Sequence, residues 1–290
     1  MRRIVALALL AATTVAIAAG TTAWRRVDQP LAQRGTSTEP DFDAFHVAMV
    51  EGMRPQARAE AVLQMAINGY SGASDYAIAN AQSWRGEVEP TATLEAMLET
   101  ALASPRIEVR MAALEVTIAR SDLAKTAQQV DALVAQRRAD PGDYNAWALW
   151  SLGAIGARGV ARERVLDELL LALRDSDAGR RKDAVEALAV FGGEEIIAPL
   201  LTIAARDPDS LVQERAFCAL AQSATLHIAE RETALPGLLA IAGARDASVQ
   251  TRSWSYQAMR EISGLTNVPE DPGAWQRTLD AAGLRTTIAR

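Results

Sequence analysis

One pattern recurs along the chain and constrains its fold more than any other feature. A polar residue is followed by a small residue three positions later, and by an apolar or small residue four positions after that. The pattern begins at Arg58, Arg110, Asn145, Arg181, Gln213 and Arg252. From Arg110 onward the starts are 35, 36, 32 and 39 residues apart. Self-similarity at this period is typical of repeat proteins, whose units stack on one another.

Each pattern helix is preceded by a turn and by another apolar stripe. Leu166, Leu169 and Leu173 fall at helical spacing before the turn Asp175–Asp177. Asp in such a turn can accept hydrogen bonds from the free amides of the following helix. A helical hairpin of this kind cannot bury its apolar stripes alone, so the hairpins must stack. The small residue of the pattern lets neighbouring helices approach closely.

The composition agrees with helices throughout. The chain holds 59 alanines in 290 residues and only 5% aromatic residues, and Ala loses no side-chain entropy in a helix. The longer gap between Arg58 and Arg110 leaves room for an extra helix around residues 73–84. The sequence therefore predicts an all-α chain with about six stacked hairpins over residues 41–264.

At the turns, the chain resembles a known family. Asp207-Pro208-Asp209 followed by residues 211–216, and residues 108–113, resemble the second-helix signature of HEAT repeats of the PBS-lyase HEAT-like type. The resemblance implies a right-handed α-solenoid. Gln213 and Asn145 stand where the family usually has Arg, which leaves open whether the turn-to-helix hydrogen bonds form there. Residues 214–223, 251–254 and 262–264 more narrowly resemble a group of exported bacterial HEAT-repeat proteins without an assigned reaction.

The last segment, residues 265–290, is expected to cap the stack. Proteins of that group end with a pair of tryptophans. Trp275 matches the first, while Thr278 or Leu279 stands where the second is expected. Terminal repeat units are atypical because they must cover exposed apolar surface. We expect Trp275 and Leu279 to lie on a short helix after Asp271-Pro272 and to cover the last hairpin.

The N-terminus has the features of an export signal. Arg2 and Arg3 precede an apolar run from Ile4 to Gly20, and no acidic residue occurs before Ala23. Residues 1–23 are therefore expected to be a cleaved signal peptide or a single-pass signal anchor, and residues 24–40 a flexible linker. Either alternative predicts an exported protein, periplasmic or anchored in the cytoplasmic membrane, whose membrane contact is limited to residues 1–23.

Residues suited to catalysis are scarce. The chain has two histidines, His46 and His227, and one cysteine, Cys218, which is expected to be a buried packing residue. Metalloprotease, phosphate-loop and paired-cysteine motifs are absent from the sequence. The sequence thus predicts no catalytic residue, no bound metal and no cofactor.

A nucleic-acid partner is also disfavoured. The chain holds 30 basic and 36 acidic residues. Residues 1–23 contain two Arg and no acid, so removing them leaves 28 basic against 36 acidic residues, a net charge of −8. Binding to phosphates requires a cationic surface.

The prediction for function is a non-catalytic scaffold that binds a protein or peptide partner on the concave face of the solenoid, within the bacterial cell envelope. Trp and Tyr dominate many interfaces. The candidate binding residues are therefore the aromatic side chains on the second helices: Tyr144, Trp147, Trp150, Trp254 and Tyr256. Two alternatives are a HEAT-like lyase or isomerase acting on a bound chromophore or other prosthetic group, and a passive structural component of an envelope assembly.

Overall fold

The structure is a computed structural model. It describes residues 40–140, 142 and 144–284. The predicted signal, residues 1–23, and all but the last residue of the predicted linker lie outside the described residues. The described residues form helices and no β-strand, with a single bridge between Asp41 and Ser71. The all-α prediction is confirmed for this part of the chain. No helix in these ranges is long and apolar enough to cross a membrane.

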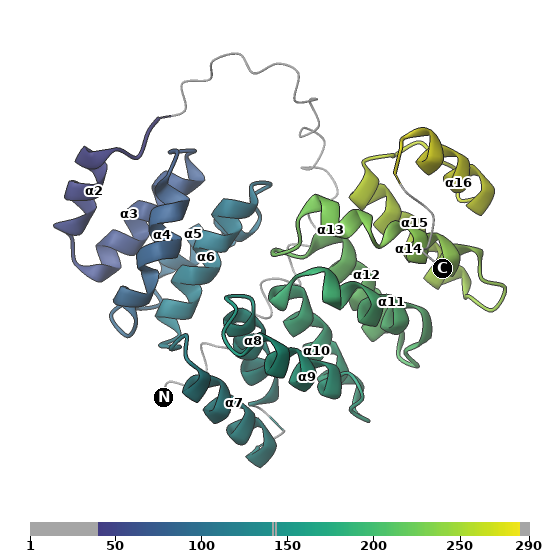
Figure 1. Cartoon of the computed structure of the whole chain (residues 1–290), viewed down its shortest axis with the longest axis horizontal. Helices are drawn as coiled ribbons and strands as arrows, with labels where there is room; N and C mark the ends of the chain where they lie inside the picture. The colour runs from purple at the N-terminus through teal and green to yellow at the C-terminus, as the bar shows by residue number, and fades with distance from the viewer. Residues whose placement is uncertain (1–39, 141, 143, 285–290) are drawn as a thin grey trace. The chain divides into compact units, whose positions relative to one another are not determined.

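The chain divides into two compact units, Met1–Lys125 and Thr126–Arg290 (Figure 1). In unit 1 the elements are α2 (Ala44–Glu51), α3 (Pro55–Ile67), α4 (Ala73–Asn80), the 3₁₀ helix η2 (Ala81–Trp84), α5 (Ala92–Leu102) and α6 (Ile107–Arg120). The extra helix predicted around residues 73–84 is present as α4 and η2. Trp84, at the end of η2, is fully buried in the core of this unit.

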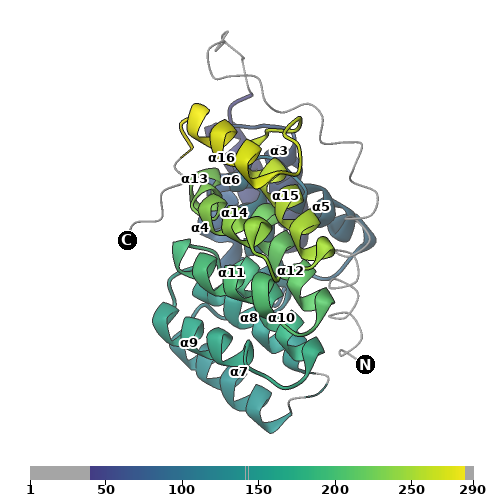
Figure 2. The same cartoon turned by 90° about the vertical axis from the view of Figure 1, so that its right-hand side faces the viewer.

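Unit 2 is a stack of helical hairpins (Figure 2). Its elements are α7 (Ala127–Ala139), α8 (Asn145–Gly156), α9 (Arg162–Ala172), α10 (Ala178–Phe191), η3 (Glu194–Ile196), α11 (Ile197–Arg206), α12 (Ser210–Gln222), α13 (Ile228–Glu232), α14 (Leu235–Gly243), α15 (Val249–Ser263) and α16 (Pro272–Ala281). The hairpins are α7 with α8, α9 with α10, α11 with α12, and α14 with α15. This is the arrangement of a solenoid.

The repeated sequence pattern marks the second helix of each hairpin. In unit 2 these second helices, α8, α10, α12 and α15, pack on one another in that order. The small and apolar pattern positions are buried, as in Ala184 and Leu188 of α10. Burying a leucine side chain contributes roughly 1.5–3 kcal/mol. The pattern therefore records which face of each second helix enters the core.

Glycine allows α8 and α10 to pack closely. A Cβ atom added at Gly153 would lie 2.4 Å from the carbonyl oxygen of Ala187. At Gly156 it would lie 2.7 Å from a methyl carbon of Val165 and 2.8 Å from the ring of Phe191. Any side chain at these two positions would push the helices apart, so the sequence fixes their spacing.

Two of the second helices, α10 and α12, begin after the aspartates that the turn sequences predicted as capping residues. The Asp177 carboxylate accepts from the backbone N–H of Arg180 at 2.9 Å, and the Asp209 carboxylate accepts from Leu211 at 2.9 Å and Val212 at 3.2 Å. These bonds satisfy amides that have no partner within the helix.

The segment predicted to cap the stack contains one helix in its described residues, α16. Helix α16 begins after Asp271, whose carboxylate accepts from the backbone N–H of Ala274 at 2.7 Å. Trp275 and Leu279 are both fully buried, and α16 packs on α14. The Trp275 ring stacks on Tyr256 with ring centroids 6.4 Å apart. The helix thus covers the last hairpin of the stack.

Candidate functional site

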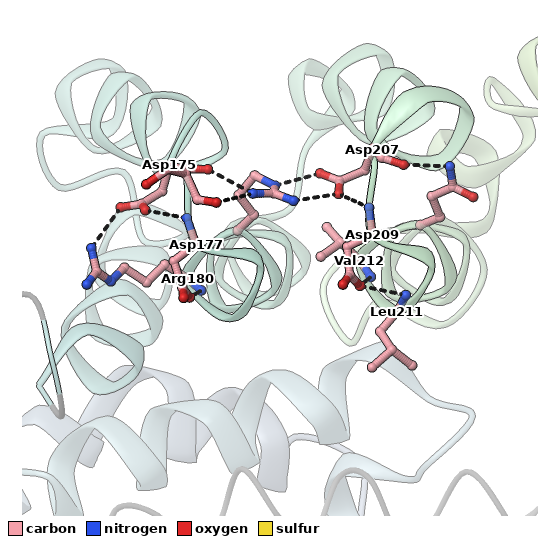
Figure 3. A network of polar contacts seen from close by, with 10 residues as sticks. Asp175, Asp177, Arg180, Asp207, Asp209, Leu211 and Val212 are labelled. Atoms are coloured by element: carbon pink, nitrogen blue, oxygen red, sulfur yellow. Dashed lines mark hydrogen bonds and ion pairs between the residues drawn. The ribbon is translucent and has the colours of Figure 1, made fainter.

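An ion-pair network joins two successive turns of unit 2 and fixes the register of its second helices (Figure 3). Arg181 Nε and Nη2 donate to the two carboxylate oxygens of Asp207, each at 2.8 Å. Arg181 Nη1 donates to the carbonyl oxygens of Asp175 and Ser176 at 2.9 and 3.1 Å. Arg181 and Asp207 are only 8% and 6% exposed. One side chain therefore holds its own turn and the next turn together.

The electrostatics of this pair are those of a satisfied buried ion pair. Burial acts to raise the pKa of Asp207, but hydrogen bonds from Arg181 and from the backbone of Asp209 lower that pKa below its usual range. The hydrogen bond to Asp207 raises the pKa of Arg181. Both side chains thus stay charged and hydrogen-bonded to each other.

The first pattern residue makes comparable bonds in other repeats. Arg110 and Arg252 donate to carbonyl oxygens of the turn before their own helix. Gln213 keeps one such bond, from its amide nitrogen to the carbonyl oxygen of Asp207 at 2.7 Å. Asn145 donates to the carboxylate of Asp183, on the next second helix, at 3.2 Å. Gln213 thus retains the turn bond, whereas the turn before Asn145 includes residues 141 and 143, which lie outside the described residues.

With the register fixed, equivalent positions of the four second helices share one surface of unit 2. The positions two and five after the first pattern residue lie beside the buried positions but are not buried themselves. We call these eight positions the second-helix face: Trp147, Trp150, Asp183, Glu186, Arg215, Cys218, Trp254 and Gln257.

Four of the five aromatic residues predicted to bind a partner are accessible. Tyr144, Trp147, Trp150 and Trp254 are each partly exposed. The rings of Tyr144 and Trp147 lie 4.8 Å apart, centroid to centroid. At the other end of the face, the Trp254 ring is 6.2 Å from the buried Phe217 ring. For these four residues a binding role stays a prediction.

The fifth candidate, Tyr256, is a core residue. It is 3% exposed and stacks on Trp275 beneath the C-terminal cap. The prediction places Tyr256 on an exposed binding surface, and its burial corrects that placement. The physical reason is the cap, because α16 covers the surface on which Tyr256 would otherwise be exposed.

Two acidic side chains occupy the middle of the second-helix face. Asp183 accepts the bond from Asn145, and the Glu186 carboxylate lies 3.5 Å from Arg215 Nε. Burial raises the pKa of both carboxyls, against the lowering effects of Asn145 on Asp183, Arg215 on Glu186 and Lys182 on both. Both carboxyl groups are thus held where solvation is incomplete.

Sequence reasoning missed Asp183, Glu186 and Arg215. The signal that identifies them is their spacing, since they stand at the same pattern positions as Trp147 and Trp150. An aromatic residue is a binding candidate from its residue type alone, whereas these charged residues become candidates only when the stacked helices place them beside the tryptophan positions.

The corresponding positions of α6, in unit 1, are closed. Ala112 and Glu115, on α6, are 0% and 3% exposed, and α4 and η2 pack against this helix. Lys125 Nζ lies 3.0 Å from the Glu115 carboxylate. The extra helix therefore replaces an open face with core packing in this unit.

Side chains suited to metal binding or nucleophilic attack are not assembled into a site in the described ranges. These residues hold no cluster of three or more His, Cys, Asp or Glu suited to a metal ion. Burial raises the pKa of the Cys218 thiol to about 11, which disfavours the thiolate. His227 caps α13, its backbone N–H donating to Glu230 at 2.7 Å, while His46 Nδ1 lies 2.7 Å from Asp43.

A comparison with protein-family models matches part of unit 2. Residues 130–221 match the family model described as HEAT repeats, a segment that runs from within α7 to the last turn of α12. No curated protein matches the chain. HEAT repeats commonly mediate contacts between proteins. The match covers about a third of the chain, and over that segment the stacked hairpins and their turn contacts are similar to HEAT repeats.

Proposed function

We propose that the protein is a non-catalytic scaffold that binds a protein or peptide partner on the second-helix face of unit 2, the concave side of a HEAT solenoid. The observation that supports this most is the placement of Trp147, Trp150 and Trp254. These large aromatic side chains stay partly exposed on helices that bury most of their other apolar residues. Tryptophan is enriched among the residues that dominate binding energy at interfaces.

The proposal places this scaffold in the bacterial cell envelope. The support is the sequence alone, in Arg2 and Arg3 and the apolar run from Ile4 to Gly20. Export as a periplasmic or membrane-anchored protein follows from the same feature. A protein partner is favoured over nucleic acid because the chain carries a net charge of −6.

Site-specific photocrosslinking in the producing cells tests the proposed face. A benzophenone amino acid at position 150 reports on the second-helix face, and one at position 171 serves as the matched control. Leu171 is 56% exposed on α9, a first helix. We expect a discrete protein adduct from position 150 and little or none from position 171.

The positions that give adducts show whether a partner contacts the second-helix face. Equal adducts from positions 150 and 171, or none from position 150, would contradict the proposed face. Fractionation of the same cells tests the location, since recovery of the chain in the cytoplasmic fraction alone would exclude an envelope role.

A further inference from the structure

The chemistry of the second-helix face points to the kind of partner it fits. Its acidic residues, Asp183 and Glu186, lie on α10, and α10 packs between α8 and α12. Trp147 and Trp150 hold the equivalent positions on α8, and Arg215 holds one of them on α12. The carboxylates therefore lie between the helix that carries the two tryptophans and the helix that carries Arg215, and Lys182 of α10 also acts on both of them.

The acidic pair is only partly satisfied within the protein. Asp183 accepts one side-chain hydrogen bond, from Asn145 at 3.2 Å, and the closest cation to Glu186 is 3.5 Å away. An ionised carboxylate offers about four acceptor sites. Both residues are partly exposed, so they keep acceptor capacity that a partner can reach.

Burial makes this arrangement costly for the free protein. Loss of solvation raises the pKa of Asp183 and of Glu186, and the two negative charges also oppose each other at Glu186. Titratable groups with such environments gather at functional sites more often than elsewhere on a protein. Lys182 and Arg215 offset only part of this cost, since both pKa values remain raised, and a positively charged ligand would offset more of it by supplying further charge and hydrogen bonds.

The neighbouring indole rings fit the same ligand. A guanidinium or ammonium group is attracted to the face of a tryptophan ring, an interaction of roughly 0.5–2 kcal/mol. Tyr144 packs against Trp147 and extends the aromatic surface. An arginine side chain can donate to a carboxylate and stack on an aromatic ring, because its guanidinium is planar and its donors form a fork.

We infer that the second-helix face takes an extended protein segment with a basic side chain, Arg or Lys, which is held by Asp183 and Glu186 and flanked by Trp147 and Trp150. This inference rests on the proposed function and names the chemistry of its partner. The Arg215 end of the face excludes a second cation close by, so the segment carries its basic residue opposite α10 and uncharged or acidic residues opposite α12.

Binding of defined peptide pools to the whole protein tests the inference. The probe is a fluorescein-labelled pool of nonapeptides with Arg fixed at the central position and mixed uncharged residues elsewhere. Matched pools carry Lys, Glu or citrulline, the neutral isostere of Arg, at that position. We expect the Arg or Lys pool to bind at least about tenfold more tightly than the citrulline pool in fluorescence anisotropy, a difference of about 1.4 kcal/mol.

The double variant Asp183→Asn with Glu186→Gln removes the charges and keeps the shape. It is expected to abolish the preference for Arg over citrulline. Its Tm should be no lower than that of the parent, because the neutral side chains no longer carry the cost of burying charge. The matched control is Glu163→Gln with Asp167→Asn, which changes two exposed carboxylates of α9 by the same charge and should leave binding unchanged.

Three results would overturn the inference: no binding of any pool, equal binding of the Arg, Lys and citrulline pools, or a preference that survives in the Asp183 and Glu186 variant. These outcomes are separate from those of the crosslinking experiment. A partner captured specifically at position 150 together with indifference to the basic pools would leave the proposed function standing and remove only the basic segment.

Discussion

The buried pair of Arg181 and Asp207 provides the sharpest prediction about stability. Replacing Asp207 by Ala removes a carboxylate that accepts two hydrogen bonds from Arg181 and one from the backbone N–H of Asp209. The guanidinium is only 10% exposed at its side chain, so water cannot readily replace the lost partner. The variant would leave a buried cation that is supported by carbonyl oxygens alone.

The size of the effect follows from this geometry. Removing one partner of a buried ion pair costs about 3–5 kcal/mol, because the other charge stays buried. Unit 2 runs from Thr126 to Arg290. In a domain of about 150–250 residues, 1 kcal/mol lowers the Tm by roughly 2–4 °C. We therefore expect Asp207→Ala to lower the Tm of the cooperative transition of unit 2 by about 10 °C.

Urea unfolding, followed by circular dichroism and tryptophan fluorescence, measures the decrease of about 3–5 kcal/mol in the free energy of unfolding. The matched control is Asp131→Ala, which breaks the pair of Asp131 with Arg164 between first helices. Those two side chains are 56% and 50% exposed, and an exposed pair is worth at most about 1 kcal/mol. A loss for Asp207→Ala no larger than that for Asp131→Ala would refute the reasoning.

The same pair predicts how stability depends on pH. The pKa of Asp207 is lower in the folded protein than in the unfolded chain, where it is about 3.9. Its contribution is therefore complete above that value and is lost as the pH falls through the folded-state pKa. Below about pH 4 the free energy of unfolding should fall more steeply for the parent than for Asp207→Ala.

Three further predictions concern packing and reactivity. Trp275→Ala should lower the free energy of unfolding by about 3–5 kcal/mol, measured by urea unfolding, because the fully buried ring fills the core under α16. A decrease of less than about 1 kcal/mol would argue against a capping role for α16. Gly153→Ala should lower the free energy of unfolding by about 1–3 kcal/mol through overpacking between α8 and α10. Gly243→Ala should not, because an added Cβ there has its nearest atom at 3.7 Å. Equal effects of the two substitutions would contradict the close approach of α8 and α10. The Cys218 thiol should react with a disulfide reagent at pH 7.5 at least about a hundredfold more slowly than free cysteine, since its pKa is raised to about 11; a rate near that of free cysteine would contradict the raised pKa.

The repeat pattern predicted much of the fold because it records burial directly. A small residue three positions after Arg181 and an apolar residue four positions later must enter the core if hairpins stack, and Ala184 and Leu188 do. The caps at Asp177 and Asp209 were predictable for the same local reason, since helix starts need acceptors within a few residues. Most of the architecture can therefore be predicted from the capping residues at the turns and from the helical periodicity.

The candidate site was harder to predict because it depends on neighbours distant in sequence. Tyr256 has the same sequence character as Trp254, yet α16 covers one and not the other. Asp183 and Glu186 have the composition of an ordinary solvated helix face. Only the register of α8, α10 and α12 places them beside tryptophans, and that register depends on contacts between repeats.

The most direct measurement of the central claim is a titration of ¹⁵N-labelled protein with the Arg nonapeptide pool, followed through the indole Nε1–H signals. If the peptide binds at the second-helix face, the indole signals of Trp147 and Trp150 shift with peptide concentration. The indole signals of the fully buried Trp84 and Trp275 stay unchanged and serve as internal controls. Shifts confined to Trp84 or Trp275, or no indole shift at a peptide concentration that saturates anisotropy, would contradict binding at this face.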